Sequence, residues 1–398
     1  MAEIVTEEAL AEEAVRTLEH VRGRRDEFVD FLSSLCRVES PTDHPETQSG
    51  VHAILGPAFE DLGYEVRVVE GRVSGNHLLA FPKRRDRSLS TQLLIGHSDT
   101  VWPLETIERM PVQVDEGRLH GPGTLDMKGG LTQIVFALRA LRDLGHEPDV
   151  TPVVFVNSDE EVGSPDSKRH VRRLARAAVR ALVLEPSLGP RGLIKTARKG
   201  LGRFDITVRG RAAHAGLEPE AGASAILELA HVIQRLNELN DPERGTTVNV
   251  GRIDGGTRPN VIAAEARASV DVRVTSLEFG AEVERRVHAI KPSTPGVTLQ
   301  VEGGIRVAPL ERTPRNMQLW ETARAIGGRM GFDLEDAMAG GGSDGNTTSL
   351  FTATLDGLGC VGDGAHANHE HIVIEPSLDR CALLTGLLLA PDAGRTPG

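Results

Sequence analysis

The sequence predicts an α/β fold made of two domains, one of them inserted into the other. In the first half of the chain, short continuous apolar runs alternate with a helical pattern, which is typical of strands buried on both faces of a parallel or mixed sheet. Near Gly200 the pattern changes to strands in which apolar and polar residues alternate. The length of 398 residues suits two or three domains of roughly 150 residues each. We therefore expect an outer domain of residues 1–199 and 307–398 and an inserted domain of residues 200–306.

The outer domain is expected to begin with a helix and to continue as a helix-covered sheet. Residues 7–36 carry apolar side chains at helical spacing, and the turn-forming segment SPTDHPE follows them. The runs LLIG, PVVFV and ALVLE are each expected to form a buried strand. Between the first two lies LTQIVFALRALRDLG, a helical pattern that ends at Gly145. Strand, helix and strand in this order indicate a mostly parallel mixed sheet flanked by helices.

The inserted domain is expected to be a small two-layer unit of ferredoxin-like topology. Phe204, Ile206 and Val208 alternate with polar residues, which predicts a strand with one buried face. The helical and alternating segments that follow are expected at residues 222–239, 246–253, 264–274, 277–290 and 297–304. The resulting order is βαββαβ, the split βαβ pattern. From residue 314 the helical pattern resumes with NMQLWETARAIGGRM, so we expect the chain to return to the outer domain there.

The composition and the charge exclude some classes of partner. The chain is 39% hydrophobic and 26% charged, which is usual for a soluble globular protein. Its formal net charge of -12 argues against nucleic acid and anionic membranes, because both favour basic protein surfaces. A small-molecule substrate remains compatible with this charge.

The cysteines and the N-terminal segment bear on the cellular compartment. Cys36, Cys360 and Cys381 are widely spaced and form no CxxC pair, so we expect free thiols in a reducing compartment. The segment MAEIVTEEALAEEAV is acidic and does not resemble a secretory signal. No apolar run approaches the ~18 residues of a membrane span. These features favour a cytoplasmic protein.

A run of three carboxylates, Asp159–Glu161, directly follows the apolar run VVFV. Like charges this close raise one another's pKa, so a compensating positive charge is expected nearby. Other histidines and carboxylates also fall at the ends of expected strands or in Gly-rich loops, namely His97, Asp99, Asp126, Glu185 and His366. Because the carboxyl ends of strands line the crevice of an open α/β sheet, we expect these side chains to gather at one edge.

Imidazoles and carboxylates in one cluster favour divalent metal ions. Two metals ~3.5–4 Å apart need a bridging carboxylate and further nitrogen or oxygen ligands on each side. No cysteine lies near these motifs, so a structural thiolate zinc site is not expected. Asp99 is spaced to accept a hydrogen bond from the free ring nitrogen of His97. Of Glu160 and Glu161, one is expected to bind metal and the other to act as general base toward a water molecule, and either could take either role.

The motifs GHSDTV, GPGTLDMKGG, DEEVGS, LEPS, GRAAHAG and GAHANHEHI occur in this order along the chain. Together they resemble the M20 family of dizinc peptidases, which includes glutamate carboxypeptidases, aminoacylases, succinyl-diaminopimelate desuccinylases and acetylornithine deacetylases. The resemblance spans roughly residues 90–375. It is closest to the glutamate carboxypeptidase branch, through GRAAHAGLEPEAGASAI and GGGSDGNTTS.

The resemblance implies a pair of zinc ions in the outer, catalytic domain, and Co²⁺ or Mn²⁺ would suit the same ligands. The implied ligands are, in chain order, His97, Asp126, Glu161, Glu185 and His366. Asp126 would bridge the ions, with His97 and Glu185 completing one site and the other two ligands completing the second. Glu160 is then the general base that takes a proton from water and returns it to the leaving amine.

The resemblance also gives the inserted domain the roles of lid and dimer interface in a homodimer. His214 in GRAAHAG is implied to reach the partner subunit's active site and to stabilise the tetrahedral oxyanion there. The substrate carboxylate would be held by Arg273, because a guanidinium fork suits a carboxylate, together with Asn260. Asn249 and the backbone N–H groups of GGGSDGNTTS, including Gly341, are further candidates for the same contact.

The expected activity is that of a metal-dependent amidohydrolase or exopeptidase. It is expected to release a C-terminal amino acid of the glutamate type from a small substrate with a free carboxylate. An aminoacylase, a dipeptidase or an N-succinyl or N-acetyl amino acid deacylase would use the same site with a different acyl pocket. A non-catalytic metal-stabilised binding module is disfavoured because the base and every ligand are present, and a two-metal phosphatase is disfavoured by the Asn–Arg pair of the lid.

Overall fold

The computed structural model describes residues 7–86 and 88–392. The chain forms two compact units. Unit 1 contains the residues up to Thr196, Arg312–Met338 and the residues from Ser343 onward. Unit 2 contains Ala197–Glu311 and Ala339–Gly342.

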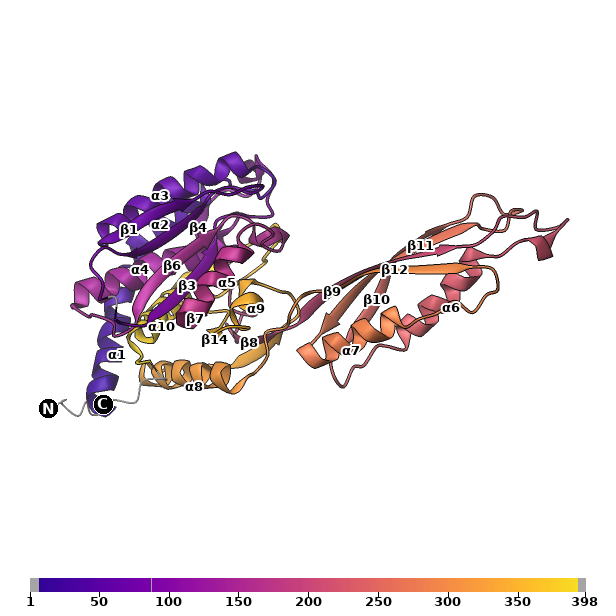
Figure 1. Ribbon diagram of the computed structural model, residues 1–398. Coiled ribbons are helices and arrows are strands. Elements are labelled where there is room, and N and C mark those ends of the chain that lie inside the picture. The colour runs from indigo at the N-terminus through magenta and orange to yellow at the C-terminus, as the bar shows by residue number, and fades with distance from the viewer. Residues whose placement is uncertain (1–6, 87, 393–398) are drawn as a thin grey trace. The chain divides into compact units, whose positions relative to one another are not determined.

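Unit 1 is built on a mixed sheet, in which the described strands lie in the order β1, β2, β6, β3, β7, β14 (Figure 1). Their bounds are β1 Tyr64–Val69, β2 His77–Pro82, β3 Thr91–His97, β6 Thr151–Asn157, β7 Ala178–Val183 and β14 Ala353–Leu355. The neighbours from β6 to β14 run parallel, whereas β1 and β2 pair in antiparallel fashion at one side. The expected mostly parallel mixed sheet is thereby confirmed.

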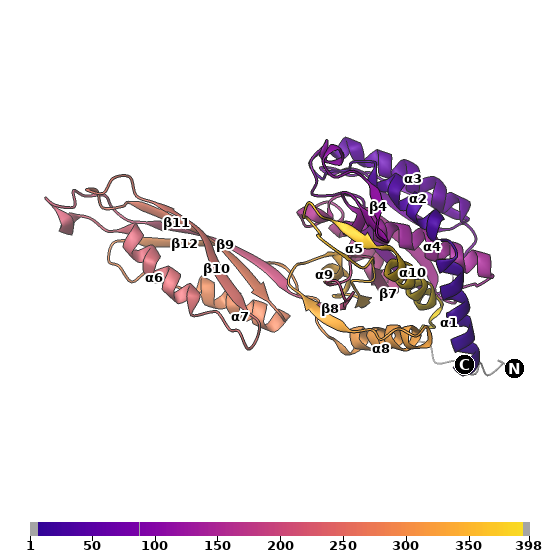
Figure 2. The same cartoon turned by 180° about the vertical axis from the view of Figure 1, so that it is seen from behind.

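Helices cover both faces of this sheet (Figures 1 and 2). Successive residues of a strand point to opposite faces, so Leu94 and Val154 enter one apolar core while Ile95 and Phe155 enter another. The second core contains Val171 of α5 (Lys168–Ala177). The first core contains residues of α1 Glu7–Arg22, α2 Arg25–Cys36, α3 Gln48–Asp61, α4 Gly129–Leu144, α8 Pro314–Arg329 and α10 Ile374–Leu389.

The segment expected as one helix over residues 7–36 forms two helices, α1 and α2. Gly23 and Arg24 separate them, and Arg24 has the non-helical dihedrals φ -103° and ψ 19°. Glycine has the lowest helix propensity after proline. The apolar periodicity continues on both sides of this break, which is why the sequence pattern reads as a single helix.

A second, antiparallel sheet of unit 1 joins segments that are far apart in the sequence. Its strands are, in spatial order, β15 Gly362–Asp363, β16 His371–Val373, β5 Arg118–His120 and β4 Gln113–Asp115. His371 of β16 lies opposite His120 of β5. The backbone N–H of Gly121 also donates to the backbone oxygen of Glu370. This pairing places the loop after β5 beside the loop between β15 and β16.

Unit 2 has the βαββαβ order, in which its strands form one antiparallel sheet in the order β10, β11, β9, β12 (Figure 1). The elements are β9 Gly200–Arg209, α6 Ala225–Asn237, β10 Thr247–Gly255, β11 Glu265–Val274, α7 Leu277–His288 and β12 Thr298–Val307. Phe204, Ile206 and Val208 are buried under the helices. Ser224 and Ser276 cap α6 and α7, since each side chain accepts a hydrogen bond from a backbone N–H of the first helical turn.

The remaining strands and α-helix of the described chain are β8 Ile194–Arg198, β13 Asp336–Ala339 and α9 Asp344–Thr348. Cys36, Cys360 and Cys381 are buried and free. Among the residues that the structure describes, the helices are too short or too polar to cross a membrane.

Candidate metal centre

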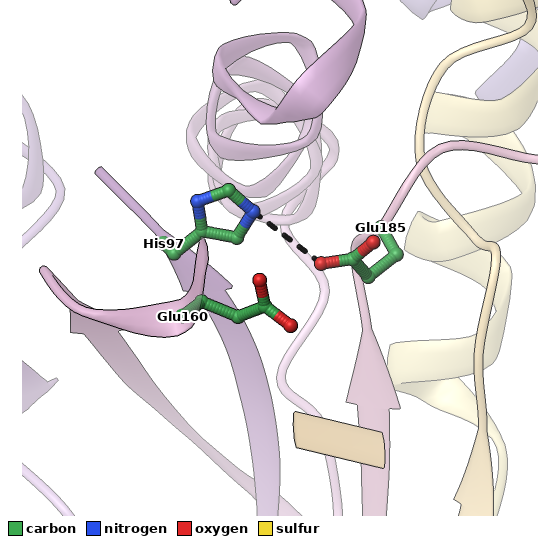
Figure 3. Close-up of side chains that lie close together, drawn as sticks. All are labelled: His97, Glu160 and Glu185. Carbon is green, nitrogen blue, oxygen red and sulfur yellow. Dashed lines mark ion pairs between the residues drawn. The ribbon is translucent and has the colours of Figure 1, made fainter. Parts of the chain in front are cut away.

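The carboxyl ends of three neighbouring strands carry most of the expected site residues. His97 is the last residue of β3, and Glu185 follows the end of β7 by two residues. Glu160 and Glu161 open a single 3₁₀ turn after β6. Because β6, β3 and β7 are adjacent and parallel, the side chains that follow them share one edge of the sheet. Figure 3 shows His97, Glu160 and Glu185 converging there.

Asp126 and His366 approach the same place from loops. Asp126 lies in the turn before α4, with non-helical dihedrals of φ -116° and ψ 97°. Its Oδ1 is 3.2 Å from Nε2 of His97, and its Oδ2 is 3.3 Å from Nε2 of His366. A carboxylate that presents each oxygen to a different imidazole can bridge two cations.

The other carboxylates divide between the two histidines. Glu185 Oε1 lies 3.4 Å from Nε2 of His97, and Glu161 Oε2 lies 3.2 Å from Nε2 of His366. Within the described chain, two overlapping groups have ligand atoms that all lie within 4.8 Å of one another: His97 with Glu160 and Glu185, and His97 with Asp126 and Glu161. The structure therefore brings together all five expected ligands and the expected base.

These groups perturb one another's pKa values strongly. The pKa of His366 is raised to about 10 by hydrogen bonds to Asp126 and Glu161. Burial opposes protonation of His97, but its bonded carboxylates still raise its pKa well above the ordinary value. Burial, followed by the charge of Glu185, raises the pKa of Glu160 well above its ordinary value. In the chain alone, imidazolium charge thus compensates the clustered carboxylates.

The residues fit a pair of divalent cations. They offer imidazole nitrogen and carboxylate oxygen, which zinc, cobalt and manganese accept in proteins. Oε1 of Glu161 is buried and, among the described residues, has no hydrogen-bond partner. A buried acceptor without a partner is costly, and a cation at this position would satisfy it.

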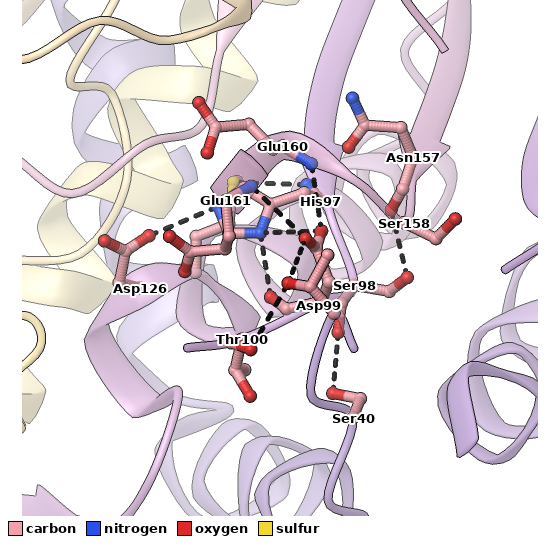
Figure 4. Close-up of polar contacts among 12 residues, drawn as sticks. Ser40, His97, Ser98, Asp99, Thr100, Asp126, Asn157, Ser158, Glu160 and Glu161 are labelled. Carbon is pink, nitrogen blue, oxygen red and sulfur yellow. Dashed lines mark hydrogen bonds and ion pairs between the residues drawn. The ribbon is translucent and has the colours of Figure 1, made fainter. Parts of the chain in front are cut away.

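Asp99 ties the His97 loop to the glutamate turn (Figure 4). Its carboxylate accepts hydrogen bonds from the backbone N–H groups of Glu160 and Glu161, at 3.3 and 3.2 Å, and from Oγ1 of Thr42 at 2.8 Å. Nδ1 of His97 lies 2.9 Å from the backbone oxygen of Asp99 and 3.4 Å from its Oδ1. The backbone carbonyl is thus the nearer acceptor for this ring nitrogen, which leaves Nε2 facing Asp126 and Glu185.

Two buried acids next to the site were missed by sequence reasoning. Glu370 accepts hydrogen bonds from the segment that carries Asp126, and burial raises its pKa to about 7. Asp344 accepts hydrogen bonds from Asn157 and Ser164, on either side of the glutamate turn, and burial raises its pKa to about 6. Both lie in Gly-rich or His-rich motifs, but no local pattern distinguishes them from exposed acids.

The expected substrate contacts lie in unit 2, whereas the ligands described above lie in unit 1. Nδ1 of His214 accepts hydrogen bonds from two backbone N–H groups of its own turn, and the backbone oxygen of Asn260 accepts one from Ala215. Arg273 is paired with Asp271 at 2.8 Å. The other candidates, Asn249 and Gly341, are exposed. Their roles toward a substrate stay predictions.

Comparisons with known proteins address the family directly. The model of a peptidase dimerisation domain, M20_dimer, matches residues 196–293. The acetylornithine deacetylase of Myxococcus xanthus is 30% identical over an alignment of 399 residues, gaps included. The alignment covers 95% of this chain and 99% of that protein. The chain belongs to the M20 family. The family expected from the motifs is thereby confirmed, and the protein is an M20-family hydrolase.

Further M20 relatives differ in the activity that they are named for. Carboxypeptidase G2 of Pseudomonas sp. (strain RS-16) is 26% identical over 377 residues, covering 92% of this chain and 90% of that enzyme. The solved structure of the Bacillus subtilis YXEP protein, described as a dinuclear metal binding peptidase from the M20 family, matches with a TM-score of 0.67 at 14% identity. This match covers 92% of this chain and 98% of the YXEP chain. The chain is thus similar to proteins that are named for different activities.

Proposed function

We propose that the protein is a metal-dependent amidohydrolase or exopeptidase, which releases a C-terminal amino acid from a substrate with a free α-carboxylate. The observation that carries this proposal is the position of the Asp126 carboxylate between His97 and His366. Glu185 lies beside His97, and Glu161 lies beside His366. Each half of the cluster thus offers an imidazole, a carboxylate of its own and one oxygen of Asp126.

We infer that these two halves hold two divalent cations, as the description of the YXEP protein supports. Zinc is the first candidate, and Co²⁺ and Mn²⁺ accept the same donors. When bound, the cations would lower the pKa of a water molecule and polarise the amide carbonyl. His97 is oriented for this role, because the acceptor at its Nδ1 leaves Nε2 available as a ligand atom.

Glu160 is the proton carrier of the proposed reaction. Its carboxylate would accept a proton as water attacks the amide carbonyl and would donate that proton to the nitrogen of the leaving amine. The backbone N–H groups of Glu160 and Glu161 both donate to Asp99, so the turn holds the two neighbouring carboxylates in fixed places. In the metal-free chain, burial and then the charge of Glu185 raise the pKa of Glu160 well above its ordinary value.

Unit 2 would supply the substrate contacts and the dimer interface. The match of residues 196–293 to a peptidase dimerisation domain supports a homodimer. In this proposal, His214 of the partner subunit stabilises the oxyanion. Arg273 and Asn260 bind the substrate carboxylate, with Asn249 and Gly341 as further candidates.

The released amino acid is proposed to be of the glutamate type, which the similarity to carboxypeptidase G2 supports. A second candidate is an N-acyl amino acid deacylase, which the 30% identity to an acetylornithine deacetylase favours. The two functions share the reaction and the site, and they differ in the acyl group and in the amino acid that is released.

A product assay tests the proposal. The zinc-loaded protein and a chelator-treated sample would be incubated with benzoyl-glutamates, N-acetyl and N-succinyl amino acids and dipeptides, and released amino acids would be measured by mass spectrometry. Glutamate release from aroyl or peptidyl glutamates is the expected result, whereas release from N-acetyl or N-succinyl amino acids alone would favour the second candidate. Glu160→Gln is expected to lower kcat by about 10²–10⁴-fold with its metal content unchanged. Full activity of this variant would refute the mechanism.

A further inference from the structure

The buried carboxylate of Glu370 accepts hydrogen bonds from backbone N–H groups of the loop that carries Asp126. Glu370 is 1% exposed. Oε1 accepts hydrogen bonds from the backbone N–H groups of Leu125 and Asp126, at 2.9 and 3.0 Å. Oε2 accepts from the backbone N–H of Gly123 at 2.9 Å and from Nε1 of Trp102 at 2.7 Å. Each carboxylate oxygen is thus shared by two donors.

These bonds satisfy a segment that has little regular structure of its own. Three of the four backbone N–H groups from Gly123 to Asp126 donate to Glu370, and that of Thr124 donates to the backbone oxygen of Gly121. The dihedrals of Gly123, with φ 71°, and of Asp126 are not helical. Buried N–H groups must find acceptors, and an ionised carboxylate gives stronger bonds than a neutral one. The backbone path that leads to Asp126 is therefore set by the Glu370 carboxylate.

Glu370 also connects this loop to the loop of His366. It follows His366 by four residues in the chain, and its backbone N–H donates to the oxygen of Ala367 in that loop. Its backbone oxygen accepts from Gly121, next to the pairing of β16 with β5. One residue thereby joins the two loops whose side chains, Asp126 and His366, lie 3.3 Å apart.

We propose that Glu370 is a positioning residue of the metal centre, which fixes the backbone of Asp126 so that its two oxygens face the two histidines. Both oxygens of Glu370 accept from N–H donors, and Glu370 belongs to neither group of candidate ligand atoms in the described chain. It acts through the ligand that it holds, as outer carboxylates do at other metal sites. This inference rests on the metal centre of the proposed function.

The test is zinc binding by Glu370→Gln. The amide keeps one acceptor oxygen and places an NH₂ group against N–H donors, so at least one pair of the four bonds is lost. Zinc stoichiometry and affinity would be measured on metal-free protein by competition with a chromophoric chelator, well below the melting temperature. We expect the affinity to fall by about 10–100-fold. Glu375→Gln is the matched control, because Glu375 is an exposed acid on α10 that pairs with Arg25, and its zinc affinity should equal that of the wild type.

The outcomes separate positioning from a general effect on folding. A merely structural role would lower the melting temperature of metal-free Glu370→Gln and leave the zinc affinity of the folded protein unchanged, and that result would overturn the proposal. Failure of the wild-type protein to bind zinc would overturn the metal centre, and the inference with it. If Glu370→Gln does not fold, Trp102→Phe decides, since it removes one side-chain donor. A loss of about threefold or more in zinc affinity is expected for it, and unchanged affinity would refute the proposal.

Discussion

Gly130, in the first turn of α4, is expected not to tolerate alanine, although alanine normally favours a helix. A Cβ atom on Gly130 would lie 2.1 Å from the backbone oxygen of Leu184 and 2.9 Å from Cε of Met127. The methionine can turn away, but a backbone oxygen cannot. Leu184 directly precedes Glu185, so the start of α4 packs against the residue next to a candidate metal ligand. A side chain at this position must therefore displace either the helix or the ligand.

The magnitude follows from the competing effects. Alanine in place of a helical glycine gains about 1 kcal/mol of helix propensity. Overpacking in a filled core costs about 1–3 kcal/mol, and a contact of 2.1 Å calls for the upper part of that range. We expect Gly130→Ala to lower the free energy of unfolding by about 1–2 kcal/mol. The required shift is about 1 Å, and a misplacement of that size near the chemistry can lower kcat by about 10²-fold.

Urea unfolding of the metal-free protein and steady-state hydrolysis would check these values. Gly328→Ala is the matched control, because Gly328 also lies in a helix, α8, and a Cβ there would meet nothing within 4 Å. That variant should be more stable than the wild type by about 0.5–1 kcal/mol and fully active. Gly359→Ala should behave like Gly130→Ala, since its Cβ would lie 2.5 Å from the backbone oxygen of Glu185. Gly130→Ala with the stability and activity of Gly328→Ala would refute the reasoning.

Three further predictions concern cations, pH and thiols. Chelation is expected to lower the melting temperature in scanning calorimetry, and added zinc to restore it, because a cation that binds only the folded chain stabilises that state. Burial, with a contribution from His77, lowers the pKa of His52 to about 4. Acidification from about pH 6.5 to pH 4 should therefore protonate the unfolded chain first and remove up to about 3 kcal/mol of stability. Urea unfolding at several pH values should show a flatter profile for His52→Gln. The buried cysteines, whose pKa values burial raises, should react with a thiol reagent only after unfolding.

Three results would contradict these predictions. A melting temperature that is insensitive to both chelator and zinc would mean that no bound cation stabilises the folded chain. A thiol that reacts at the rate of a free cysteine in the folded protein would contradict its burial. For His52, an unchanged pH profile in the glutamine variant would assign the acid transition to another group.

The candidate ligands at the strand ends could be predicted because the sequence patterns that mark them are local. His97 and Glu185 follow Val- and Leu-rich runs, and such runs form central parallel strands whose ends share one edge. The βαββαβ order of unit 2 was predictable for the same reason, since alternating and helical periods change clearly along the chain. By contrast, strands of two or three residues, such as Gly362–Asp363 and His371–Val373, are too short to show any period.

Glu370 could not be found from the sequence, because its environment is made by distant pairing. Nothing near it in HANHEHI separates it from a solvated acid. Its burial depends on the pairing of β16 with β5, which brings Gly121 and the Asp126 loop beside it. Asp344 is similar, since its partners Asn157 and Ser164 come from a strand end far away in the sequence. Residues that position a site through backbone contacts can thus be identified only once the fold is known. The candidate ligands themselves can be expected from their place at strand ends.

The adjacent glutamates, Glu160 and Glu161, contribute carboxylates to different halves of the cluster. Consecutive residues of a 3₁₀ turn project in different directions, so Glu160 lies with His97 and Glu185 while Glu161 reaches His366. Asp99 accepts the backbone N–H of each glutamate, which fixes the turn against the loop of His97. The run DEE is therefore not three charges competing for one position. It is a way to place one carboxylate in each half of the cluster from a single strand end, and this separation requires that the two glutamates remain adjacent.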